Sequence, residues 1–161
     1  MKTVLAGFAG HVPRALEARY PSANISRSSP WGSFSAQYSA NSLLEASDPL
    51  FGRIGRAFVE IQTEEFGTDH IYSADTFNEM APRSFEANYI QGWGSSVHNA
   101  LNNADPEAVW LVQGWSLQFW PADALRSYWS DVPEGRLLVL DLDGAASATS
   151  WQQWTNLSRP V

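Results

Sequence analysis

The sequence predicts an α/β fold in which parallel strands alternate with helices. Four short apolar runs are rich in β-branched and aromatic residues, amphipathic segments lie between them, and no tract of linker composition divides the chain. Such alternation is typical of right-handed βαβ units, either in a doubly wound sheet or in part of a barrel. Four strands do not close a barrel, and an eight-stranded α/β barrel needs about 250 residues. With 161 residues, the chain is expected to form part of one domain without a separate second domain.

The four apolar runs are predicted to be buried parallel strands. Each ends near polar or glycine positions, and they cover residues 3–8, 70–76, 108–113 and 136–142. Between the first two runs, residues 22–42 are rich in Ser, Asn, Gly and aromatic side chains. This composition predicts a long loop, and loops of that length usually serve a function.

The clearest helix follows Ser47-Asp48-Pro49 and ends at Gly67. Weaker amphipathic patterns predict a helix around residues 89–101 and another from Pro121 to residue 129. All three should cover one face of the sheet, so that residues 3–142 leave the other face open to association with a second copy or a complementing chain. The face of the first helix that should pack on the sheet consists of Leu50, Ile54, Ala57, Phe58 and Ile61.

Composition excludes several classes of function. Ten Lys and Arg against seventeen Asp and Glu give a net charge of -7 without a basic run, so we expect no nucleic-acid partner. There are no cysteines, and the three histidines show no metal-ligand spacing, so we expect neither a metal nor another cofactor. The N-terminal apolar run is too short for a membrane helix and is not a convincing targeting segment. The sequence therefore predicts no membrane partner and assigns no compartment.

The second run ends in Asp75-Thr76-Phe77-Asn78-Glu79. Catalytic groups of α/β barrels lie at the carboxyl ends of strands. An Asn-Glu pair leaving a barrel strand is similar to the acid/base position of many retaining glycosidases, which makes Glu79 a candidate general acid. A solvated loop glutamate is the alternative. Asp75 is predicted to accept buried hydrogen bonds at the strand ends.

Two tryptophans are candidate sugar platforms, because indole rings offer flat surfaces to the C–H faces of sugars. Trp31 lies in the long loop and Trp115 follows the third run, although most of the eight tryptophans must belong to the core. We expect both to face one concavity near Glu79. His11, just past the first run, could bond a substrate hydroxyl or serve a structural role. Asp141 and Asp143 add carboxylates near the end of the fourth run.

These residues carry a resemblance to the α-N-acetylglucosaminidases, glycoside hydrolase family 89. The similar segments include Gly7-Phe8-Ala9-Gly10-His11-Val12-Pro13, Asp48-Pro49-Leu50-Phe51, and residues 65–72, 74–80 and 108–115. The resemblance implies about half of a TIM-type (β/α)8 barrel. It also implies retaining hydrolysis of terminal α-linked N-acetylglucosamine from glycans such as heparan sulfate, in lysosomal or secreted enzymes. By resemblance, Glu79 is the acid/base, and Trp31, Asn78 and Trp115 surround the sugar.

The chain also departs from the family pattern. The family's nucleophilic glutamate lies downstream of residue 161, the stretch before Phe119-Trp120 is shorter than usual, and Ala145 replaces a usual glutamate. We therefore expect an internal fragment that lacks the nucleophile and is inactive alone, and Asp141 is not expected to substitute. The alternatives are an inactive sugar-binding remnant or a half-barrel that assembles with another chain.

Overall fold

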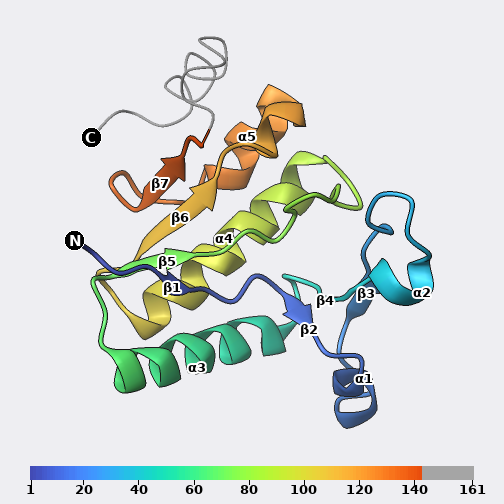
Figure 1. Ribbon diagram of the computed structural model, residues 1–161, viewed down its shortest axis with the longest axis horizontal. Helices are drawn as coiled ribbons and strands as arrows, with labels where there is room; N and C mark the ends of the chain where they lie inside the picture. The colour runs from blue at the N-terminus through green and yellow to red at the C-terminus, as the bar shows by residue number, and fades with distance from the viewer. Residues whose placement is uncertain (143–161) are drawn as a thin grey trace.

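A four-stranded parallel sheet forms the centre of the fold (Figure 1). The computed structural model describes residues 1–142. The strands lie in the order β1-β5-β6-β7, and all neighbours are parallel. Each falls within a predicted run, so the prediction of parallel strands is confirmed. Their bounds are β1 (Leu5–Ala6), β5 (Ile71–Ser73), β6 (Val109–Gln113) and β7 (Leu137–Leu140).

A helix follows each of the first three strands of this sheet, as predicted. They are α3 (Pro49–Phe66), α4 (Ala87–Ala104) and α5 (Ala122–Trp129), and a 3-10 turn, η1 (Leu117–Phe119), precedes α5. Helix α3 begins where Asp48 Oδ1 accepts a hydrogen bond from the Leu50 N–H at 2.8 Å. It ends at Gly67, whose φ of 71° suits glycine. No helix within residues 1–142 is long and apolar enough to span a membrane.

The buried face of α3 differs from the predicted one. Phe58 and Ile61 are 41% and 67% exposed, and Ala57 is also exposed. Gly55 of α3 packs closely against α4, since a Cβ there would lie only 2.6 Å from the Cβ of Ala100. Because a residue without a side chain makes this close contact, hydrophobic periodicity did not identify the buried face. The buried residues of α3 are Leu50, Phe51, Gly55 and Val59.

Helices α3, α4 and α5 cover one face of the sheet (Figure 1). Tyr72 of β5 and Trp110 of β6 are paired in register and fully buried. The Tyr72 hydroxyl reaches Thr63 of α3, while the Trp110 ring packs against Tyr128 of α5. On the other face of β7, alternate residues are exposed: Leu138 is 46% and Leu140 39% exposed. Leu111 of β6, which is paired with Leu138 and shares this face, is only 8% exposed. Among the described residues, the face that was expected to be open is therefore exposed only at its edge strand.

A second, antiparallel sheet lies in the segment between β1 and α3. Its strands are β2 (His11–Val12), β3 (Ile25–Arg27) and β4 (Ser42–Leu44), in the order β2-β4-β3. Two short helices, α1 (Ala15–Arg19) and α2 (Ala36–Ser39), lie between them. The prediction of a loop over residues 22–42 is therefore wrong, since strands of two or three residues are too short to show an alternating pattern. We call residues 11–44 the antiparallel arm.

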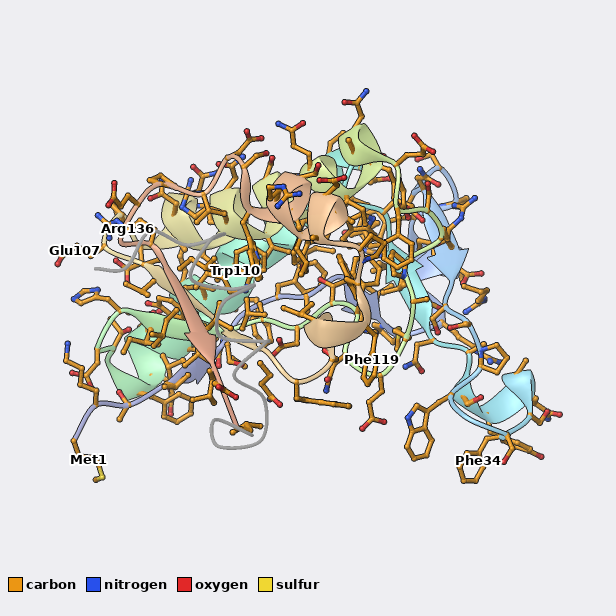
Figure 2. All side chains as sticks on the ribbon, turned by 90° about the horizontal axis from the view of Figure 1, so that it is seen from above. Met1, Phe34, Glu107, Trp110, Phe119 and Arg136 are labelled. Atoms are coloured by element: carbon orange, nitrogen blue, oxygen red, sulfur yellow. The ribbon has the colours of Figure 1, made fainter. Side chains whose placement is uncertain are left out.

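The arm lies beyond the carboxyl ends of the parallel strands (Figure 1). Figure 2 shows Phe34 of the arm at one end of the long axis, with Glu107 and Arg136, just before β6 and β7, at the other. The ends of β5 and β6 consequently point toward the arm, so the loops that leave them can contact it.

A hydrogen-bonded group joins the amino end of β5 to the end of α4. Asp105 Oδ2 bonds His70 Nδ1 at 2.8 Å and accepts the Tyr72 hydroxyl at 2.6 Å. The hydrogen bond to Asp105 raises the pKa of His70. Burial opposes ionisation of Asp105, but the hydrogen bonds from Tyr72 and His70 outweigh it and lower the pKa of Asp105. Both shifts favour the charged pair in the folded chain.

We predict that this pair makes folding pH-dependent. Because the folded pKa of His70 is raised, its contribution is full below the unfolded value of 6.5 and disappears as the pH rises through the folded pKa. The contribution of Asp105 is present above 3.8 and disappears as the pH falls through its lowered pKa. His70→Asn suits the local φ of 65° and removes the ring. The difference in Tm between the chain and this variant should shrink between about pH 6 and pH 8; a constant or growing difference would contradict the assignment.

Candidate active site

The turn after β5 buries the side chain of Phe77 and exposes that of Glu79. Phe77 is buried, with ring centroids 5.1 Å from Trp93 and 5.7 Å from Trp120. Two residues later, Glu79 is exposed and has a φ of 57°. A left-handed backbone costs a non-glycine residue about 1–3 kcal/mol, so surrounding contacts must hold it. The turn therefore presents Glu79 at the carboxyl end of a parallel strand.

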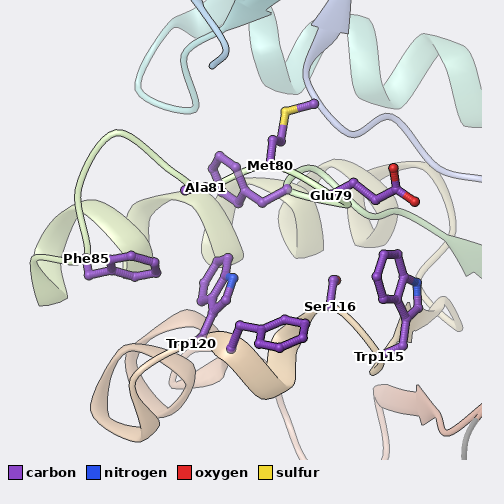
Figure 3. Close-up of a pocket in the computed structure, with 9 residues that line it drawn as sticks. Glu79, Met80, Ala81, Phe85, Trp115, Ser116 and Trp120 are labelled. Carbon is purple, nitrogen blue, oxygen red and sulfur yellow. The ribbon is translucent and has the colours of Figure 1, made fainter. Parts of the chain in front are cut away.

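Glu79 lines a cavity of about 620 Å³ between the loops that follow β5 and β6. Trp115, from the second loop, lies on the facing side (Figure 3). The rest of the lining is almost entirely apolar, so a ligand here would meet aromatic surface beside one carboxyl group. The remaining lining residues are Phe77, Met80, Ala81, Phe85, Ser116, Phe119 and Trp120.

Trp31 approaches Glu79 from the antiparallel arm. Its indole N–H donates a hydrogen bond to Glu79 Oε2, across 48 residues of sequence. The indole stacks on Phe34, with ring centroids 5.2 Å apart and an interplanar angle of 3°. Trp31 lines a cavity of about 360 Å³ with Phe34, Tyr38, Ser39 and Asn41. The two tryptophans thus lie beside Glu79 but line different cavities, instead of the single concavity expected from the sequence.

Asn78 and His11 have different surroundings. Asn78 Oδ1 is buried and has no hydrogen-bond partner among residues 1–142. A buried acceptor without a partner is rare. Asn78 lines a separate small cavity with Thr76 and Ser116 and does not line the cavity of Glu79. His11 Nε2 bonds the Thr76 carbonyl at 2.9 Å. Since a carbonyl only accepts, this nitrogen carries the proton, and the contact favours the structural interpretation of His11.

Asp75 connects the ends of two strands. Its Oδ1 accepts the Gln113 N–H at 2.8 Å, and its Oδ2 accepts the Ser73 hydroxyl at 3.4 Å. Burial raises the pKa of Asp75. These contacts agree with the predicted structural role. Asp143 and Ala145 lie outside the described residues.

The family model for the TIM-barrel domain of alpha-N-acetylglucosaminidase matches residues 1–159. The chain belongs to this family. It is 47% identical over 146 residues to the human alpha-N-acetylglucosaminidase, an alignment that covers 88% of this chain and 20% of the human protein. The chain thus spans about a fifth of the length of that relative.

Solved structures of a family 89 glycoside hydrolase from Clostridium perfringens share the fold. The complex with 2-acetamido-1,2-dideoxynojirmycin has a TM-score of 0.79 and 22% identity, covering 97% of this chain and 17% of that one. A glutamine variant in complex with its substrate GlcNAc-alpha-1,4-galactose has a TM-score of 0.72 and 22% identity, covering 88% and 16%. Together with the family, these likenesses confirm the expected partial TIM-type barrel.

For this member of the family, the sequence named Glu79 and Trp115 as candidates, and the structure brings these two to one cavity, but most of the surrounding wall was not named. Both were candidates because they lie shortly after the ends of strands, six residues after β5 and two after β6. The apolar residues Met80, Phe85 and Phe119 were not identified as cavity residues. The aromatic density of residues 115–120 was the available signal, but core packing explains such density equally well. Within residues 1–142, no group of three or more His, Cys, Asp or Glu side chains could hold a metal ion.

Proposed function

We propose that this chain supplies the general acid/base and part of the sugar pocket of a retaining α-N-acetylglucosaminidase. The observation that carries this proposal is the Glu79 carboxylate, which is presented on a left-handed turn at a strand end and lines a cavity with Trp115. The family membership supports the choice of reaction, which remains a proposal for a chain that spans a fifth of its relative. The substrate would be a glycan with terminal α-linked N-acetylglucosamine, including glycans of the heparan sulfate type.

In this reaction, Glu79 first donates a proton to the glycosidic oxygen as the bond to the anomeric carbon breaks. A second carboxylate attacks that carbon and forms a covalent glycosyl-enzyme, which requires the two carboxyl groups to be about 5–5.5 Å apart. We assign the second carboxylate to a glutamate outside residues 1–161. Glu79, now ionised, then takes a proton from water as the water attacks the anomeric carbon, and the sugar is released with its configuration retained.

The neighbouring residues have matching roles in this proposal. The Trp31 N–H orients the Glu79 carboxyl through its hydrogen bond. Trp115 offers an aromatic wall to the apolar side of the sugar. The Asn78 oxygen, which is buried without a partner among the described residues, would accept from the sugar's acetamide N–H or a hydroxyl. His11 would act indirectly, by holding the carbonyl of Thr76.

A complementation experiment tests the proposed function. The 161-residue chain alone should not measurably hydrolyse an aryl α-N-acetylglucosaminide, because an acid without its nucleophile leaves most of the barrier in place. Adding the remaining barrel strands as a second chain should produce turnover, which is measured as release of the aryl group. Enzyme-like turnover by the repurified chain alone would contradict the assignment of the nucleophile. Binding of N-acetylglucosamine without turnover after barrel assembly would instead favour the sugar-binding remnant.

A further inference from the structure

The antiparallel arm holds the turn that carries Glu79 at more than one point. Before the turn, His11 of β2 bonds the carbonyl of Thr76 at 2.9 Å. At the turn itself, Trp31 donates its indole N–H to the Glu79 carboxylate. Both contacts start in the arm and end on the segment that leaves β5. A third contact, on the far side of Glu79, has no role in the proposed reaction.

This third contact is made by Glu45, which directly follows β4. Glu45 is only 4% exposed, and both of its carboxylate oxygens are engaged. Oε1 lies 3.2 Å from Arg83 Nη1, and Oε2 accepts the Tyr89 hydroxyl at 3.1 Å. Arg83 lies on the loop after Glu79, and Tyr89 is in the first turns of α4. Burial raises the pKa of Tyr89, so its hydroxyl remains a donor.

We propose that Glu45 is a positioning residue for Glu79, acting through its ion pair with Arg83. The inference rests on the proposed acid/base role for its functional meaning. Glu45 fixes the loop four residues after Glu79, while His11 fixes it three residues before. A left-handed turn held on both sides has little freedom to relax. Because displacement of a catalytic group by about 1 Å can cost a hundredfold in rate, such fixation is a direct contribution to catalysis.

A role in positioning also explains why a carboxylate is buried here. Burying the Glu45 carboxylate has a desolvation cost that offsets much of its attraction to Arg83, so the pair is a weak source of stability. The contacts of the Glu45 carboxylate do, however, fix geometry, because Arg83 and Tyr89 must both lie in the right place to reach its two oxygens. The Arg83 side chain is largely exposed, with 62% of it accessible. Replacing it should therefore leave the chain folded.

The test measures the contact between Trp31 and Glu79 in the 161-residue chain, so it needs no turnover. The indole ¹⁵N–¹H signal of Trp31, assigned with Trp31→Phe, is compared with and without Glu79→Ala. Removing the carboxylate should move this signal. The same comparison is then made in Arg83→Met, which keeps the length of the side chain but not its charge. In this background, the displacement of the Trp31 indole signal that Glu79→Ala causes should fall by at least half. Glu45→Gln should reduce this displacement to the same extent.

Two controls separate positioning from general loss of structure. Arg83→Lys retains a cation within reach and should keep the displacement. Arg56→Met removes a surface ion pair with Glu60 on α3, at 2.7 Å, and should also keep it. An unchanged displacement in Arg83→Met and Glu45→Gln, or no displacement in the parent chain, would overturn the inference. Failure of the barrel to hydrolyse substrate would instead count against the proposed function and leave this result standing.

Discussion

Glu79→Gln should lower the hydrolysis of α-N-acetylglucosaminides with poor leaving groups by about a hundredfold to ten-thousandfold in the reassembled barrel, the range that general acid catalysis contributes. The glutamine oxygen can still accept the Trp31 N–H, so the geometry of the turn should survive. Only the transferable proton is lost. The measurement is kcat/KM for glycosides whose leaving groups differ in pKa.

The dependence on the leaving group distinguishes acid catalysis from a structural effect. An activated aryl leaving group needs little protonation, so formation of the glycosyl-enzyme from it should be much less affected than with a natural sugar alcohol. The matched control is Glu65→Gln, which replaces an exposed carboxyl on α3. It should leave kcat/KM unchanged for both kinds of glycoside. Equal losses for both kinds of leaving group would argue that the substitution distorts the site and that Glu79 is not the acid.

The largest effect on stability is expected at Gly94 of α4. A Cβ at this position would lie 1.6 Å from the carbonyl oxygen of Tyr128 and 2.7 Å from its carbonyl carbon. Both atoms belong to the backbone of α5, which cannot rotate away as a side chain could. Gly94→Ala should therefore cost about 3 kcal/mol or more of unfolding free energy, because the two helices must separate.

Gly92 provides the control on the same helix. A Cβ there meets no atom within 4 Å, and the residue is exposed. Gly92→Ala should stabilise the chain by about 0.5–1 kcal/mol, since alanine loses less backbone entropy on forming a helix. Chemical denaturation of both variants would measure the contrast. Similar changes in the two variants would show that α4 and α5 do not approach as closely as the structure places them.

Much of the candidate site depends on contacts that no local pattern reports. The Trp31–Glu79 hydrogen bond joins residues 48 positions apart, and the Glu45–Arg83 pair joins residues 38 apart. In sequence, Glu45 has the appearance of an ordinary polar residue before a helix. Its burial becomes evident only once β4 has been placed beside the loop after β5.

The sequence by itself determined the features that depend on neighbouring residues. Asp48 and Gly67 marked the ends of α3 because capping is a local interaction. Glu79 became a candidate because it lies shortly after the apolar run of residues 70–76. Only the tertiary structure decided which face of α3 is buried, because that face is set by the approach of α4 to Gly55. It likewise decided that Trp31 and Trp115 line separate cavities. Packing between elements far apart in the chain selects among faces that local periodicity leaves equivalent. The arm contacts the Glu79 turn because the parallel sheet brings the carboxyl ends of its strands to one side, next to the arm.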